Sequence, residues 1–276
     1  MPAFNAQGGM PYWIDLNTPE PEAAARFYTG LLNWQVNEEV EGSGYLVARV
    51  QGLPVAGLIP ATGGATTWVT YFLADDLEAQ LDRIGELGGK VLAGPTDAQI
   101  GRMGVAADPN GALFGLVEPR GEDAFVAGGE PGCAVWHELT CTSGFDEALD
   151  FYTGLFGWQS ATVGGEGTDL PRYGTLLADS APFAGLRDAA GHFPEGVHGF
   201  WQTFLGVLDV DKAAARVPEL GGEVIQGPFD AEFGRLLIIA DPTGATVTLC
   251  EVEEYEELDI QEGNDVFEAL RAQGLG

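Results

Sequence analysis

Two short stretches carry the same potential for acid–base chemistry: residues 13–16 read Trp-Ile-Asp-Leu and residues 136–139 read Trp-His-Glu-Leu. Both lie in runs typical of a β-strand, in which alternate side chains share a face. A carboxylate beside an aromatic wall suits a ligand pocket, and partial burial would raise its pKa toward acid–base duty. Asp15 and Glu138 are therefore the candidate catalytic residues. The alternative is that each carboxylate hydrogen-bonds backbone groups or an arginine in a packed core.

The same reasoning predicts which side chains surround these acids. Asn17 and Thr140 follow on the expected inward face, and Tyr71 would offer a hydroxyl to a ligand or simply bridge core and solvent. The candidate ligand-binding residues are Trp13, Asn17, Trp68, Tyr71, Trp136, His137, Thr140, Trp201, Gln202 and Thr248.

These stretches belong to a tandem duplication. Phe-Tyr-Thr-Gly-Leu occurs at 27–31 and 151–155, and Asp-Pro-x-Gly-Ala at 108–112 and 241–245. The six tryptophans also form three pairs, in which Trp13, Trp34 and Trp68 correspond to Trp136, Trp158 and Trp201. Repetition on this scale determines the architecture before any other feature is considered.

Each half predicts two βαβββ units, so the fold class is α+β with four units in all. We expect a first domain at 11–118, a linker at 119–132, a second domain at 133–252 and an acidic tail at 253–276, with a mobile leader before residue 11. Each domain, of roughly 120 residues, is large enough for its own core.

The composition of the chain argues against several classes of function. A net charge of −30 over 276 residues argues against binding to nucleic acid or an anionic membrane surface. No apolar run is long enough to span a bilayer, and the N-terminus lacks a signal-peptide pattern, so a cytoplasmic protein is expected. The three cysteines do not form a disulfide framework or a zinc motif.

The four units, the Phe-Tyr that ends each first helix and the Asp-Pro-x-Gly hairpins together resemble the vicinal oxygen chelate superfamily, which includes glyoxalase I, extradiol dioxygenases and bleomycin-resistance proteins. The Trp-x-acid-Leu openings and the Ala-Gly-Leu after each fourth strand are similar to its two-domain actinobacterial glyoxalase-like members. The resemblance implies that each domain is a curled, half-open barrel of two units. Fold alone does not assign a function.

The resemblance also implies where a divalent metal would bind: a His or Gln on the first strand, a His on the strand that opens the second unit, and late glutamates. Counting from Phe-Tyr gives Trp13 or His137 at the first position, whereas aligning Trp-x-acid-Leu places His137 on the opposite face. Gln202 is the second candidate ligand, and His192 and His198 lie in a Gly-rich loop that is a poor position for a third. Because Glu118 and Glu251 fall on the wrong face by parity, we expect no metal cofactor.

The leading hypothesis is metal-independent binding or transformation of a small organic molecule, such as an antibiotic or specialised metabolite, by a monomer or homodimer. The first alternative is a metal-dependent lyase, isomerase or dioxygenase that uses His137 and Gln202. The second is a non-catalytic interaction protein whose cavities are filled. Whether the chain is an enzyme stays open at this point.

Overall fold

The computed structural model describes residues 3–253, except 62, 64, 65, 121–124, 166, 169, 179, 232 and 233. Within this part of the chain, no helix is long and apolar enough to cross a membrane. The predicted acidic tail lies almost entirely outside the described residues.

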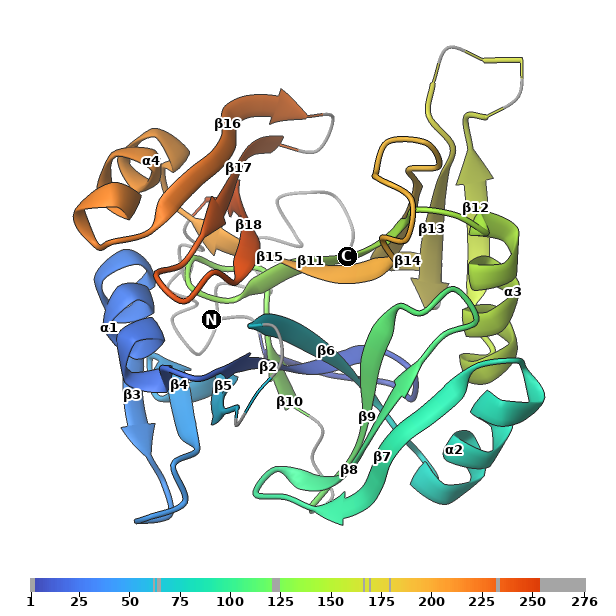
Figure 1. Ribbon diagram of the computed structural model, residues 1–276, viewed down its shortest axis with the longest axis horizontal. Coiled ribbons are helices and arrows are strands. Elements are labelled where there is room, and N and C mark those ends of the chain that lie inside the picture. Colours follow the sequence, from blue (N-terminus) through green and yellow to red (C-terminus); the bar gives the residue numbers. More distant parts are fainter. Residues whose placement is uncertain are drawn as a thin grey trace, which may run out of the picture.

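Two eight-stranded sheets, one from each half, form the centre of the molecule (Figure 1). The first-half sheet has the order β3-β4-β5-β2-β6-β9-β8-β7, and the second-half sheet has the corresponding order β12-β13-β14-β11-β15-β18-β17-β16. The first-half strands are β2 (Pro11–Thr18), β3 (Gln35–Glu38), β4 (Leu46–Val50), β5 (Leu53–Pro60), β6 (Thr67–Leu73), β7 (Lys90–Asp97), β8 (Gly101–Ala107) and β9 (Leu113–Pro119). The second-half strands are β11 (Ala134–Cys141), β12 (Gln159–Val163), β13 (Tyr173–Ala178), β14 (Ala181–Asp188), β15 (Phe200–Val207), β16 (Glu223–Ala231), β17 (Gly234–Ala240) and β18 (Thr246–Glu251). This arrangement confirms the α+β fold of four βαβββ units in two tandem domains, with open rather than closed sheets.

Each unit contributes one amphipathic helix that follows its first strand. The helices are α1 (Pro21–Leu32), α2 (Leu77–Glu86), α3 (Phe145–Phe156) and α4 (Val210–Glu219). The second helix of each half begins at an aspartate N-cap, where Asp76 accepts from the Ala79 N–H at 3.0 Å and Asp209 from the Lys212 N–H at 2.9 Å. These side chains satisfy a backbone donor that the first turn leaves free.

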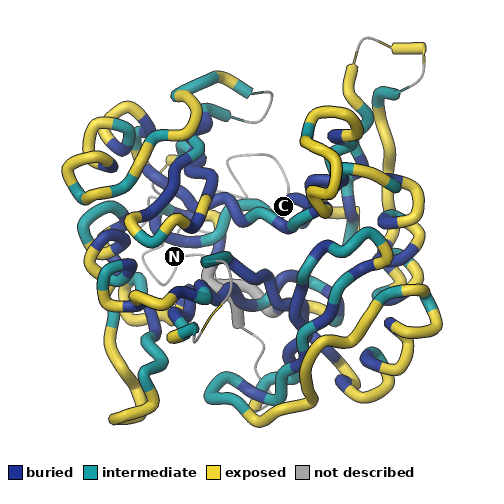
Figure 2. Tube along the Cα trace, in the orientation of Figure 1, coloured by how far each residue is buried: buried dark blue, intermediate teal, exposed yellow. Residues whose placement is uncertain are grey.

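The pairing of central strands determines which residues share a face. β2 pairs antiparallel with β6, so Trp13 lies opposite Tyr71 and Asp15 opposite Val69. We call the face that carries Trp13 and Asp15, and its counterpart with Trp136 and Glu138, the inner face of each sheet. The helices cover the other face. Figure 2 shows buried residues along the central strands and exposed ones on the outer sides of the helices.

The helix-side cores are shared between the two halves. One core joins residues of α1 with residues of α4, and another joins residues of α2 with residues of α3 (Figure 1). A buried hydrogen bond from the Tyr28 hydroxyl to Asp241 Oδ2, 3.1 Å long, links the Phe-Tyr motif of the first half to the Asp-Pro turn of the second. Each first helix thus packs against the last helix of the other half, whereas each inner-face cluster contains residues of one half alone.

The segments outside the two sheets pair with one another. β1 (Ala3–Asn5), in the leader expected to be mobile, runs antiparallel to β10 (Phe125–Ala127), in the predicted linker. Leader and linker thus form a small two-stranded sheet.

Candidate functional site

The inner face of the first half carries a hydrogen-bonded cluster of an acid and two aromatic residues. The Trp13 indole N–H donates to Asp15 Oδ1 at 2.8 Å, and the Tyr45 hydroxyl donates to the same oxygen at 2.9 Å. Trp13 and Tyr45 also lie within hydrogen-bond distance of each other, at 3.1 Å. Gly57 is required beside them, because a Cβ there would overlap both Asp15 Oδ1 and the Tyr45 hydroxyl. Asp15 therefore fixes the orientation of two rings on this face.

Asp15 is a buried carboxyl group with no cationic partner among the described residues. Only 1% of the residue is exposed, and burial raises its pKa to about 6, although the hydrogen bonds from Trp13 and Tyr45 oppose this shift. Its second oxygen, Oδ2, has no hydrogen-bond partner within the described part of the chain. A buried acceptor without a partner is costly, which marks it as a place to look for function.

Tyr71 completes the aromatic wall. It lies opposite Trp13 across β2 and β6 and is buried, and burial together with the charge of Asp15 raises its pKa. Gly115 makes room for it, since a Cβ at that position would overlap the Tyr71 ring. Trp13, Asp15 and Tyr71 therefore lie on the inner face, as predicted.

The second half repeats the cluster but adds a cation. The Trp136 indole N–H donates to the Tyr173 hydroxyl at 3.1 Å, and Arg187 Nε donates to Glu138 Oε1 at 3.1 Å. Burial raises the pKa of Glu138, and the charge of Arg187 opposes the increase. Glu138 thus follows the alternative foreseen for these acids, a carboxylate paired with arginine.

Beyond Glu138, a chain of polar contacts crosses the inner face of the second half. Gln202 Nε2 and Arg187 Nη2 both donate to Thr140 Oγ1, at 2.8 and 3.2 Å. Thr248 Oγ1 donates to Gln202 Oε1 at 3.3 Å. The predicted residues Thr140, Gln202 and Thr248 are therefore brought together, and Arg187 joins this chain at its Thr140 end.

A pocket of about 230 Å³ opens on the inner face of the first half. Trp13 and Val47 line it, and its rim carries Glu39 and Arg49, which form an ion pair. The rim also includes Gln99, whose Nε2 donates to Glu39 Oε2 at 2.6 Å. The pocket therefore combines an aromatic wall with a charged, hydrogen-bonding rim.

One wall of this pocket comes from the second half. β2 pairs with β5 only from Asp15 onward, so the two strands diverge beside Trp13 and Ile14. His137 of β11 lines the same pocket. Its Nδ1 lies 3.2 Å from Thr203 Oγ1, and burial lowers its pKa to about 3, so the ring is neutral at physiological pH. His137 was predicted as a ligand-binding residue on the face opposite Glu138, and the structure places it at the first-half pocket.

The register excludes a metal site made by His137 and Gln202. Gln202 lies opposite Glu138 across β11 and β15, whereas His137 lies opposite Thr203, so the two side chains occupy opposite faces of the sheet. The alternative ligand pair is wrong for this reason.

Two other predicted binding residues do not lie on an inner face. Trp68 and Trp201 pair with Leu16 and Leu139 and are buried in the helix-side cores. The Trp201 indole N–H donates to the Tyr152 hydroxyl at 2.8 Å. They belong to the cores because each lies one residue out of phase with the inward positions.

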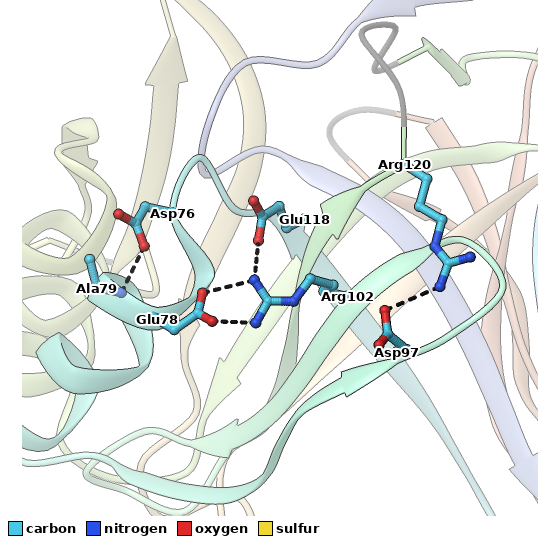
Figure 3. A network of polar contacts seen from close by, with 7 residues as sticks. All are labelled: Asp76, Glu78, Ala79, Asp97, Arg102, Glu118 and Arg120. Atoms are coloured by element: carbon cyan, nitrogen blue, oxygen red, sulfur yellow. Dashed lines mark hydrogen bonds and ion pairs between the residues drawn. The ribbon is translucent and has the colours of Figure 1, made fainter.

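The remaining positions do not fit a divalent metal. Val69 and Gly115 occupy the first-half ligand positions, and neither can coordinate an ion. Figure 3 shows Glu118 turned toward Arg102, which also contacts Glu78 of α2. Glu118 Oε2 lies 3.3 Å from Arg102 Nη1. Arg120 and Asp97 form a separate ion pair nearby. Among the described residues, no group of three His, Cys, Asp or Glu side chains is placed to hold a metal. A hard divalent cation needs several such donors.

Sequence reasoning missed Tyr45, Tyr173 and Arg187. A signal was present for the tyrosines, because Ala-Gly-Leu at 56–58 and 184–186 marks the glycine that faces each of them, and both tyrosines precede that glycine by 12 residues. Arg187 directly follows the second Ala-Gly-Leu, where the first half has Ile59.

Comparison with known proteins agrees with this architecture. The family model described as the Glyoxalase/Bleomycin resistance protein/Dioxygenase superfamily matches residues 12–116 and 137–249. The chain therefore belongs to this superfamily.

Two relatives are similar to the chain in sequence, and two solved structures are similar to it in fold. The "Putative glyoxylase CFP32" of Mycobacterium tuberculosis is 33% identical over 247 residues, which are 86% of this chain and 92% of that protein. The "Anthracycline biosynthesis protein DnrV" of Streptomyces peucetius is 32% identical over 265 residues, 89% of this chain and 94% of that one. The 2,2',3-trihydroxybiphenyl 1,2-dioxygenase of Sphingomonas wittichii shares the fold, with a TM-score of 0.61 and 17% identity over 91% of this chain and 94% of that one. The Mn(II)-bound glyoxalase of Novosphingobium aromaticivorans also shares the fold, with a TM-score of 0.62 and 19% identity over 91% of this chain and 84% of that one.

Proposed function

We propose that the chain binds a small, planar organic molecule in the first-half pocket without a metal ion. The observation that carries this proposal is the cluster of Trp13, Tyr45 and Asp15, in which a buried carboxylate holds an indole that lines the pocket. A fixed aromatic ring loses little conformational entropy when a flat ligand stacks on it.

The size of the pocket limits the ligand. Its volume, about 230 Å³, is below the roughly 300–1,000 Å³ of pockets for drug-sized molecules, so one or two fused rings would fit. A larger aromatic molecule would insert only one end. The relative named for anthracycline biosynthesis supports a hydroxylated aromatic natural product as the ligand class.

Polar groups around the ring would select among aromatic ligands. A ligand hydroxyl could contact the Arg49–Glu39 pair at the rim or the neutral ring of His137. We propose binding as the core activity and assign Asp15 as a positioning residue, because it reaches the pocket through Trp13. Glu138 has no catalytic role in this proposal, since it is paired with Arg187.

The repeat provides a matched control for the test. Binding of 1-naphthol, measured by isothermal titration calorimetry, should be saturable in the native chain and weakened at least about tenfold by Trp13→Ala, which is a loss of about 1.4 kcal/mol or more from the missing stacking contact. Trp136→Ala, at the same strand position of the second half, should leave the affinity unchanged. Equal losses in both variants, or no saturable binding of hydroxylated one- and two-ring arenes, would refute the proposal.

A further inference from the structure

The inner faces of the two halves differ at one set of corresponding positions. In the second half these positions hold Thr140, Arg187, Gln202 and Thr248, which form a continuous hydrogen-bonded chain. The first half has Asn17, Ile59, Val69 and Gly115 in their places. The inner face of the second half thus carries the guanidinium of Arg187 where the first half has the alkyl side chain of Ile59.

Arg187 is held in position from one edge only. Its Nε donates to Glu138 and one Nη2 hydrogen to Thr140, which leaves three N–H groups without a partner among the described residues. The side chain is 39% exposed, whereas Glu138 is 5% exposed beneath it. The buried carboxylate and threonine therefore fix the plane of the guanidinium and leave its outer edge free.

The same half also carries an apolar cluster. Phe204, Leu236 and Cys250 form a small buried cluster on the same inner face, and Trp136 and Phe229 pack against it. Trp136 connects the two regions, because its indole N–H bonds to the Tyr173 hydroxyl, whose pKa is raised by burial and by the nearby charge of Glu138.

We propose that the inner face of the second half is a second binding site, for a carboxylate attached to a planar apolar body, with Arg187 as its anchor. A pre-organised guanidinium presents two parallel N–H groups that match the two oxygens of a carboxylate. The partly exposed rings of Trp136 and Phe229, at the edge of the apolar cluster, would receive the body of the ligand. This site shares no residue with the lining of the first-half pocket, so the proposal stands independently of the function proposed above.

The competing explanation is that Arg187 serves only as the counterion of Glu138. Both explanations require the Arg187–Glu138 pair, but only a binding site predicts that the outer edge of the guanidinium takes up an anion. Benzoate is a suitable probe, and benzamide is its neutral counterpart of the same shape.

The experiment is calorimetric titration of the full chain with each compound. We expect saturable binding of benzoate, much weaker binding of benzamide, and at least about a tenfold loss of benzoate affinity in Arg187→Lys, which keeps the charge but loses the planar fork. The double variant Glu138→Gln/Arg187→Ile, which leaves no buried charge unpaired, should abolish binding while its circular dichroism spectrum stays native. Trp13→Ala should bind benzoate normally. Absence of saturable benzoate binding, or equal affinity in the double variant, would show that Arg187 is a counterion only.

Discussion

Arg187 lies two residues after Gly185 and donates to Glu138 at 3.1 Å, whereas Ile59, two residues after Gly57, occupies the same place beside Asp15. A single difference between the two copies therefore leaves one buried acid paired and the other without a cation. Burial raises the pKa of both acids, and only in the second half does the charge of a neighbouring cation oppose the increase, which separates the chemistry of the two inner faces.

A cation placed beside Asp15 should return the pKa of its carboxyl group toward the ordinary value. In Ile59→Arg, the new guanidinium would lie beside Asp15 as Arg187 lies beside Glu138, so the pKa of Asp15 should fall from about 6 toward its ordinary range. The pKa can be measured by NMR titration of the Asp15 carboxyl carbon. Ile59→Leu keeps the volume without the charge and should leave the pKa near 6. An unchanged pKa in Ile59→Arg would show that the two positions are not equivalent.

Asp15 should also make stability depend on pH. Its folded-state pKa of about 6 lies above the unfolded value of about 3.9, so the folded state binds the proton more tightly. The resulting stabilisation is fully present below about pH 4 and is lost as the pH rises through 6. The difference between the two pKa values corresponds to about 3 kcal/mol.

Replacing the charge tests this effect. Urea unfolding gives the free energy of unfolding of Asp15→Asn and of the native chain at each pH. The variant's value minus the native value should be about 2–3 kcal/mol larger at pH 8 than at pH 4. Glu138→Gln is the matched control, and its gain between the same pH values should be smaller because Arg187 already stabilises the Glu138 charge. The explanation fails if both variants respond to pH in the same way.

Gly57 should be intolerant of a methyl group. Gly57→Ala would force the new Cβ into Asp15 Oδ1 and the Tyr45 hydroxyl, so we expect a loss of about 1–3 kcal/mol of stability and weaker 1-naphthol binding. Gly85→Ala is the control: it lies in α2 with no atom near its added Cβ, and it should stabilise the chain by about 0.5–1 kcal/mol. Thermal unfolding of the two variants should therefore shift in opposite directions.

The sequence predicted the four units and the inward acids because both depend on periodicity and repetition. It could not assign Trp68 and Trp201, since a tryptophan fits a ligand wall and a core equally well and a one-residue difference in strand phase decides between them. The shared cores and the position of His137 depend on how the halves pack, which no local pattern encodes. Tyr45, directly before β4, and Tyr173, at the start of β13, were missed because they are distant in the sequence from the acids they contact.

The most direct test of the central claim is 1-naphthol binding by protein that has been treated with a chelator and shown by elemental analysis to be free of metal. The proposed site predicts one binding event per chain, with an affinity that does not change when Mn(II), Ni(II), Zn(II) or Fe(II) is restored. Binding that requires one of these ions, or a stoichiometric metal in protein as purified, would contradict it.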